Sequence, residues 1–171
     1  TCTADVTVID DTDPIITGCP LSQNVSVNVG TCSATLSDYT VGLTLSDNCS
    51  LSGNLTVVQS PVSGTTISDT TAVTITVTDE AGNSSVCSFN VIVVDDEDPV
   101  ISNCPADQNV ARGLGCAATL MDYTSGLTLS DNRTNTVNLT VVQSPVSGTS
   151  FTGSQAVTIT VTDAAGNSST C

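Results

Sequence analysis

Residues 72–79 read AVTITVTD, and this short stretch decides the fold class. Val73, Ile75 and Val77 alternate with threonines, which is the period of two expected of a strand that buries one face. The same alternation recurs in NVSVNV (24–29), SATL (33–36), NLTVV (54–58) and FNVIVV (89–94), with Gly, Pro, Asn and Asp between the runs. Helix signals are absent. The pattern predicts a small β-sandwich, in which two sheets pack face to face.

The chain contains two copies of one unit. NLTVVQSPVSGT occupies 54–65 and again 138–149, and GLTLSDN occupies 42–48 and again 126–132, so both pairs are offset by 84 residues. An acid-rich segment is repeated as well, as VIDDTDPIITGCP (8–20) and VVDDEDPVISNCP (93–105). Two units of about 85 residues therefore fill the chain.

The composition excludes several classes of protein. The chain of 171 residues has a net charge of -15, no histidine, and only two basic residues, Arg112 and Arg133. Without histidine or lysine it lacks the usual groups of acid–base and Schiff-base catalysis, so we expect no enzyme. We also expect no nucleic acid partner, because phosphate contacts need clustered Lys and Arg. No apolar run approaches the roughly 20 residues that span a bilayer, so we expect no membrane insertion.

Eight cysteines could be metal ligands or disulfide partners. The chain has no C-x-x-C pair and no histidine, so a zinc site would need four thiolates from distant positions. The spacing therefore favours disulfides formed in an oxidising compartment, and it predicts an extracellular protein, secreted or at a cell surface.

Four motifs carry a resemblance to a known family. They are GTCSATL (30–36), SDNC (46–49), VTVTDEAGNSSVCSFNVIVVDDEDP (75–99) and VTDAAGNSSTC (161–171). In these motifs both units resemble the HYR (hyalin repeat) domain, an immunoglobulin-like module of animal extracellular proteins and of tandem arrays on secreted bacterial proteins. The resemblance implies an all-β chain of two tandem immunoglobulin-like β-sandwich domains. It also implies a spacer, adhesive or interaction module and not an enzyme.

The order of strands in the family sets the expected domain boundaries. The last strand follows the AGN turn, and in the complete copy it covers Val86 to Val94, which residues 1–9 (TCTADVTVI) match position for position. We therefore expect residues 1–9 to be the last strand of a preceding domain and residues 10–94 to be the first HYR-like domain. Residues 95–171 would be a second, incomplete domain, whose last strand is supplied by a neighbouring chain or repeat.

A sandwich that lacks an edge strand exposes unpaired backbone groups beside an open groove. A strand from a neighbour supplies both hydrogen bonds and apolar side chains, and here it would offer Ala4, Val6 and Val8 to the groove. Because such a head-to-tail contact does not close on itself, we expect a structural subunit of an extracellular filament or stalk, whose partners are copies of itself. The alternative is that the 171 residues are a window of one longer polypeptide with covalently continuous repeats.

A second function hypothesis is an adhesin, that is, a segment of a long secreted tandem-repeat protein that binds surface glycans or proteins. Such a segment is expected to present exposed aromatic or arginine side chains. The chain has two Tyr, two Phe and two Arg among its 171 residues. This scarcity favours the structural hypothesis.

In the first unit we expect Cys19 to pair with Cys32, and Cys49 with Cys87. Four cysteines allow three connectivities, and this pairing is one of them.

In the second unit we expect Cys104 to pair with Cys116. Arg133 stands at the place of Cys49, which leaves Cys171 without a partner in its own domain, and Cys2 is equally alone. We therefore expect an intermolecular disulfide between Cys171 of one subunit and Cys2 of the next. The alternative is that Cys2 and Cys171 are equivalent positions, duplicated by the way in which the chain was cut.

Carboxylates crowd both hinges, and like charges this close repel unless something neutralises them. In an immunoglobulin-like sandwich the hinge before a domain lies beside the loop between its second and third strands and beside its last hairpin turn. A cluster of oxygen ligands suits a hard cation, so we expect Ca²⁺ at each hinge, although the same residues also serve turn geometry. The candidate ligands are Asp10, Asp11, Asp13, Asp47, Asn48, Asp79 and Asn83 at the first hinge, and Asp95, Asp96, Asp98, Asp131, Asn132, Asp163 and Asn167 at the second.

Overall fold

The computed structural model describes residues 2–113 and 115–171. Apart from two 3₁₀ turns of three residues, all its elements in these ranges are strands, which confirms the predicted all-β class. The chain divides into two compact units. The first unit consists of Thr1–Asn28 and Ser33–Val94, and the second of Val29–Cys32 and Asp95–Cys171.

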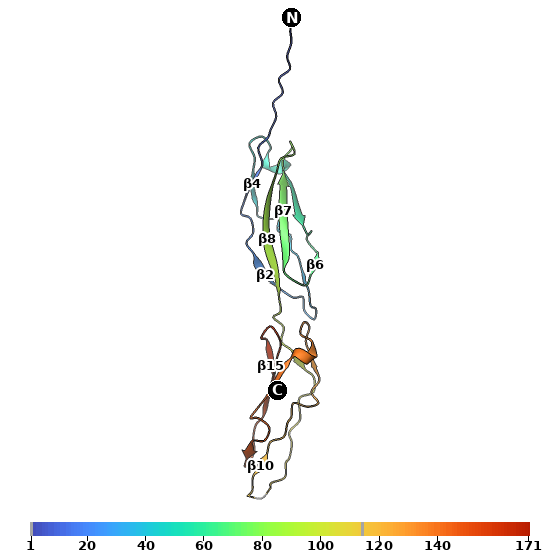
Figure 1. Ribbon diagram of the computed structural model, residues 1–171, viewed down its shortest axis with the longest axis vertical. Coiled ribbons are helices and arrows are strands. Elements are labelled where there is room, and N and C mark those ends of the chain that lie inside the picture. Colours follow the sequence, from blue (N-terminus) through green and yellow to red (C-terminus); the bar gives the residue numbers. More distant parts are fainter. Residues whose placement is uncertain (1, 114) are drawn as a thin grey trace. The chain divides into compact units, whose positions relative to one another are not determined.

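The first unit holds the larger sheet, whose strand order is β2-β8-β7-β5 (Figure 1). Two short antiparallel pairs, β1 with β4 and β3 with β6, complete this unit. Its elements are β1 (Ile15–Thr17), β2 (Gln23–Ser26), β3 (Ala34–Thr35), β4 (Thr44–Ser46), η1 (Ser52–Asn54), β5 (Thr56–Ser60), β6 (Thr66–Ile67), β7 (Thr71–Thr78) and β8 (Ser84–Val94).

Strand β7 contains the stretch that predicted the fold. Val73, Ile75 and Val77 are fully buried, while the threonines between them lie on the half-buried face. Strand β8 pairs through Ser84–Val91 with the whole length of β7, and it begins two residues before the predicted Val86. Its C-terminal half buries Phe89 and two valines and pairs in parallel with β2. The last strand of this unit therefore joins β2 to β7 in the sheet and supplies buried side chains to the core.

A buried glutamine holds the loop that precedes β4. The Gln59 side chain accepts a hydrogen bond from the backbone N–H of Tyr39 (2.7 Å) and donates to the carbonyls of Ser37 and Pro61 (both 3.0 Å). Gln143 makes the equivalent three bonds in the second unit. Because all three partners are backbone groups, the side chain replaces bonds that a regular strand would make.

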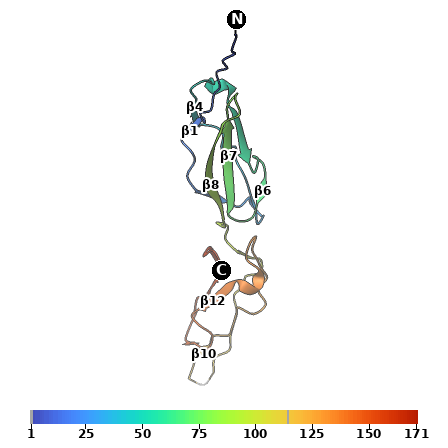
Figure 2. The same cartoon turned by 45° about the horizontal axis from the view of Figure 1, so that its top comes forward.

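The second unit repeats this plan with shorter strands. Its largest sheet has the order β12-β14-β15, and the pairs β9 with β11 and β10 with β13 complete it. Figure 2 labels β10 and β12 of this unit. Its elements are β9 (Val100–Ile101), β10 (Ala118–Thr119), β11 (Leu129–Ser130), η2 (Thr136–Asn138), β12 (Thr140–Ser144), β13 (Ser150–Phe151), β14 (Thr158–Thr162) and β15 (Ser168–Thr170).

The two units differ where β8 has no full counterpart. In the first unit Thr71–Val73 pair with Phe89–Val91, and Gln23–Ser26 pair with Val91–Val94. The matching residues of the second unit, 155–157 and 108–111, form no strand, because β15 stops at Thr170. Val157, the counterpart of the fully buried Val73, is only partly buried. Both losses have the same cause, since each of these segments has lost its pairing partner.

The disulfides differ from the predicted ones. Cys19 is bonded to Cys87, with 6.1 Å between their Cα atoms, so the predicted pairs of Cys19 with Cys32 and Cys49 with Cys87 are wrong. Strand β1 packs against β8, and Cys19 lies two residues after the end of β1, which places it opposite Cys87. Cys32 and Cys49 lie in exposed loops and form no disulfide.

The second unit repeats this bond, between Cys104 and Cys171, with 5.9 Å between the Cα atoms. The predicted pair of Cys104 with Cys116 is therefore wrong. The predicted bond between Cys171 and Cys2 of another subunit is wrong as well, because Cys171 already has a partner within its own unit. Cys2 and Cys116 are exposed and form no disulfide.

The expected donor strand is residues 1–9, of which residue 1 lies outside the described residues. Residues 2–9 form no strand in this chain, and all eight are exposed (Figure 1). Val6 and Val8 are 91% and 93% exposed. In the equivalent register of β8, Val91 and Val93 are 0% and 8% exposed. The same apolar pattern is thus buried in one copy and open to solvent in the other.

Candidate functional site

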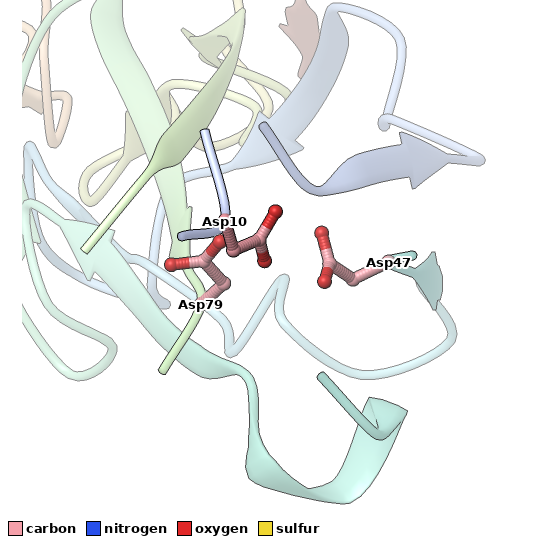
Figure 3. Close-up of side chains that lie close together, drawn as sticks. All are labelled: Asp10, Asp47 and Asp79. Carbon is pink, nitrogen blue, oxygen red and sulfur yellow. The ribbon is translucent and has the colours of Figure 1, made fainter. Parts of the chain in front are cut away.

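Three carboxylates from distant parts of the sequence meet in the first unit. Asp10 lies in the hinge before β1, Asp47 follows β4, and Asp79 follows β7. One oxygen from each lies within 4.8 Å of the others, and Figure 3 shows the three side chains turned toward one another. We call this group the first acidic cluster. The predicted meeting of hinge, loop and hairpin turn is the arrangement that the structure has here.

The turn after β7 fixes Asp79. Its Oδ1 accepts hydrogen bonds from the backbone N–H groups of Gly82 (2.6 Å) and Asn83 (2.7 Å), and its Oδ2 accepts one from the Asn83 side chain (2.7 Å). Burial raises the pKa of Asp79, but these hydrogen bonds outweigh it, so the pKa lies below its ordinary value. Asn83 also donates to the carbonyl of Asp10 (3.2 Å), which ties the hinge to the turn.

The second unit contains the same arrangement. Asp95, Asp131 and Asp163 bring one oxygen each within 4.8 Å of one another, and we call them the second acidic cluster. Asp163 accepts from the backbone N–H groups of Gly166 (2.6 Å) and Asn167 (2.8 Å), as Asp79 does in its own turn. Asn167 donates to the carbonyl of Asp95 (3.2 Å). The hinge, the loop and the turn are therefore joined in the same way in both units.

The donor atoms of both clusters fit a calcium ion. Oδ2 of Asp10 and Oδ1 of Asp47 are buried and accept no hydrogen bond, and neither do Oδ1 of Asp131 and Oδ1 of Asn132. A buried polar atom without a partner is costly, and a cation would compensate it. Oxygen ligands lie 2.3–2.6 Å from Ca²⁺, so two of them are at most about 5 Å apart, which the observed spacing meets.

Not every predicted ligand joins a cluster. Asp11, Asp13, Asp96 and Asp98 are exposed and lie outside both groups. The predicted asparagines Asn48, Asn83 and Asn167 turn their amide N–H groups toward the cluster, since Asn48 donates to Oδ1 of Asp10 (3.1 Å) and the other two donate to the hairpin aspartates. These three amides orient the carboxylates, whereas the sequence had suggested oxygen ligands.

The two clusters differ in the residue that follows the loop asparagine. In the first unit this is Cys49, and local desolvation together with Asp10 and Asp47 raises the pKa of its thiol. In the second unit it is Arg133. Burial, with the charges of the neighbouring aspartates, raises the pKa of Asp95, and the Arg133 guanidinium acts in the opposite direction. The second cluster therefore has a cationic side chain of its own nearby.

A groove of about 830 Å³ opens in the second unit. One side consists of Gln108–Val110 and the other of Gln155–Val157, the two segments that have no strand partner. The Cys104–Cys171 disulfide, Leu120, Tyr123, Phe151 and Ile159 also line it. In the first unit, the segments equivalent to the two sides hold the C-terminal half of β8 between them.

The chain was compared with protein families and with solved structures. The family model described as HYR domain matches residues 9–93. Among solved structures, the human Desmocollin-1 ectodomain is similar, with 13% sequence identity and a TM-score of 0.34. The match covers 96% of this chain and 36% of that chain, so the present chain spans about a third of its length. Within the described residues, no helix is both long and apolar enough to cross a membrane.

Proposed function

Because residues 9–93 of this chain belong to the HYR domain family, we propose that the protein is a structural subunit of an extracellular filament. In this filament, HYR-like domains join head to tail, and each open groove is completed by a β-strand from the neighbouring repeat. HYR domains are extracellular modules without enzymatic activity. The disulfide inside each unit supports an oxidising, extracellular location.

The open groove of the second unit carries this proposal. Its two sides have the positions of β2 and the start of β7, which in the first unit hydrogen-bond to Phe89–Val94 from both directions. A strand laid between them would satisfy two rows of backbone groups and cover the apolar side chains of Leu120, Phe151 and Ile159 that line the groove. No other position among the described residues offers two unpaired segments that have a paired counterpart in the repeat.

Residues 3–9 have the pattern that the groove requires. In register with β8, Cys2 takes the position of Cys171, so the added strand begins at Thr3, and Val6 and Val8 take the positions of Val91 and Val93. Burying each of these exposed valines stabilises the assembly by about 1.5–3 kcal/mol.

Assembly tests the proposal directly. We expect the purified chain to form oligomers whose mean mass rises with concentration in light scattering after size exclusion. The variant Val6→Asp/Val8→Asp should remain near 17.2 kDa, because two charges cannot enter the groove. Val62→Asp, at a valine that is 65% exposed on another loop, is the matched control and should assemble normally. A wild-type chain that stays monomeric at high concentration would contradict strand exchange.

The same strand could reach the groove along one continuous polypeptide. The denatured, reduced mass of the native assembly distinguishes the two arrangements. A mass near 17.2 kDa means separate subunits with donated strands. A mass several times larger means covalently continuous repeats, and it would refute donation while leaving the groove and its occupant unchanged.

We also propose that the acidic clusters bind Ca²⁺, with Asp10, Asp47 and Asp79 as ligands in the first unit. The ion would neutralise their repulsion and join three segments that meet only at this point. Affinity should be in the range of roughly 10⁻⁴ to 10⁻³ M that is typical of extracellular modules. The second cluster should bind more weakly, because the Arg133 guanidinium already offsets part of its charge.

Calcium titration tests this second part. At such an affinity, 10 mM Ca²⁺ should stabilise the first unit by about 1.4–2.7 kcal/mol. Asp47→Asn should abolish this gain, and Asp11→Asn, which removes the same charge at an exposed hinge position, should preserve it. An identical response of both variants would show that Ca²⁺ acts by general screening of the negative charges and does not bind at the first acidic cluster.

A further inference from the structure

In the first unit a phenylalanine of the last strand belongs to the core. Phe89 is 6% exposed, and its ring packs edge to face against Tyr39, with 5.1 Å between the ring centroids. Ile67 of β6, also 6% exposed, belongs to the same buried cluster. Phe89 and Ile67 therefore contribute one large aromatic and one medium aliphatic side chain to the same core cluster.

The second unit has a different residue at the position of Ile67. The segments SPVSGTTI (60–67) and SPVSGTSF (144–151) are equivalent, so Phe151 replaces Ile67, and both pair with the equivalent alanine of the facing strand. Phe151 lines the groove together with Tyr123, the counterpart of Tyr39. The first unit thus has its phenylalanine on the last strand, and the second unit has one on β13.

Residues 3–9 have the complementary change. In register with β8, Ala4 takes the position of Phe89, and the two valines are retained. Large and small residues have therefore exchanged places between the strand and the groove. Because protein interiors are close-packed, such an exchange conserves volume, whereas two phenylalanines would overfill the same space.

We propose that the groove of the second unit selects its strand by size, through the pair of Phe151 and Ala4. A strand with the sequence of residues 3–9 fits, and a strand such as the C-terminal half of β8, with its phenylalanine, does not. This inference rests on the proposed strand complementation. The selection determines which unit follows which in the assembly, because each type of last strand is accepted by only one type of unit.

An extended chain tests the rule. A copy of residues 3–9 is joined after Cys171, with and without Ala4→Phe in the copy, on the natural background and on the Phe151→Ile background. The readouts are the unfolding midpoint of the second unit and the hydrogen-exchange protection of the amides of residues 155–157. Phe151→Ile without any extension shows whether that substitution alone allows folding.

On the natural background we expect the alanine copy to raise the midpoint by about 10 °C or more and to protect these amides. The phenylalanine copy should lose about 5–15 °C of that gain, because the extra ring overpacks the groove. On the Phe151→Ile background the phenylalanine copy should raise the unfolding midpoint more than the alanine copy does. This reversal is the result that supports the proposal.

Two other results would overturn it in distinguishable ways. If both copies stabilise and protect the second unit equally on both backgrounds, the strand is taken up but is not selected by size. If neither copy raises the midpoint or protects the amides, the groove does not accept this strand at all, and the proposed strand complementation fails with the inference.

Discussion

Replacing both Cys19 and Cys87 by alanine should lower the stability of the first unit by about 4 kcal/mol. The bond joins residues 68 apart in the sequence, and on the chain-entropy model a closed loop of that length restricts the unfolded chain by about this amount. For a unit of this size, the loss corresponds to a fall in the unfolding midpoint of about 15–30 °C. Both cysteines are replaced together so that no new thiol is left to exchange.

The matched control is Cys32→Ala/Cys49→Ala. Both residues are exposed and form no disulfide, so the change should stay within about 0.5 kcal/mol. Thermal and urea unfolding of the 171-residue chain, followed by circular dichroism, measures both variants, and a non-reducing peptide map identifies the bonds directly.

This control also discriminates between connectivities. If Cys19 were bonded to Cys32 and Cys49 to Cys87, each of the two double variants would lose both bonds of the first unit, and the control variant would be destabilised about as much as the Cys19→Ala/Cys87→Ala variant. Similar losses of stability in both variants, or a peptide joining Cys19 to Cys32, would refute the assignment made from the structure.

Three further predictions concern single side chains of the first unit. Gln59→Leu should cost about 2–3 kcal/mol in chemical unfolding, because three backbone groups lose a buried partner; a cost below 0.5 kcal/mol would mean that water replaces it. Val91→Ala should cost about 2 kcal/mol, whereas Val86→Ala on the exposed side of the same strand should cost almost nothing, and equal losses would contradict the assigned facing of β8. Thr40→Val should raise the pKa of Asp38 toward 3.8 in an NMR titration, because the Thr40 hydroxyl and N–H hold that pKa below its ordinary value. The stability from this contact is present above the unfolded pKa and is lost as the pH falls through the folded one, so the two proteins should differ in stability above about pH 4 and converge in stronger acid; parallel curves would refute the contact.

The strands were predictable because their cause is local. Val73, Ile75 and Val77 alternate with threonine, and a period of two selects a strand in any sandwich that buries one face. The meeting of Asp10, Asp47 and Asp79 could also be anticipated once the strand order of the family was known, because that order brings hinge, loop and hairpin turn to one end of the unit.

The disulfides could not be predicted in the same way. Sequence spacing suggested the nearby pair of Cys19 and Cys32, but a disulfide requires Cα atoms within about 7 Å, and that distance depends on which strands lie side by side. Packing of β1 against β8 brings Cys87 opposite Cys19, although 68 residues separate them. The role of Phe151 was missed for a related reason. Its signal was present, since Ile67 changes to Phe within an otherwise repeated segment, but only the groove shows what the ring replaces.

The sequence by itself therefore determined the repeat, the all-β class, the alternating core strands and the acidic hinges, because each of these is set by neighbouring residues or by direct comparison of the two copies. The tertiary structure decided the disulfide partners, the side chains of each acidic cluster, and the two sides of the open groove. These depend on distances between segments that are far apart in the chain, and such distances are fixed only when the sheets pack.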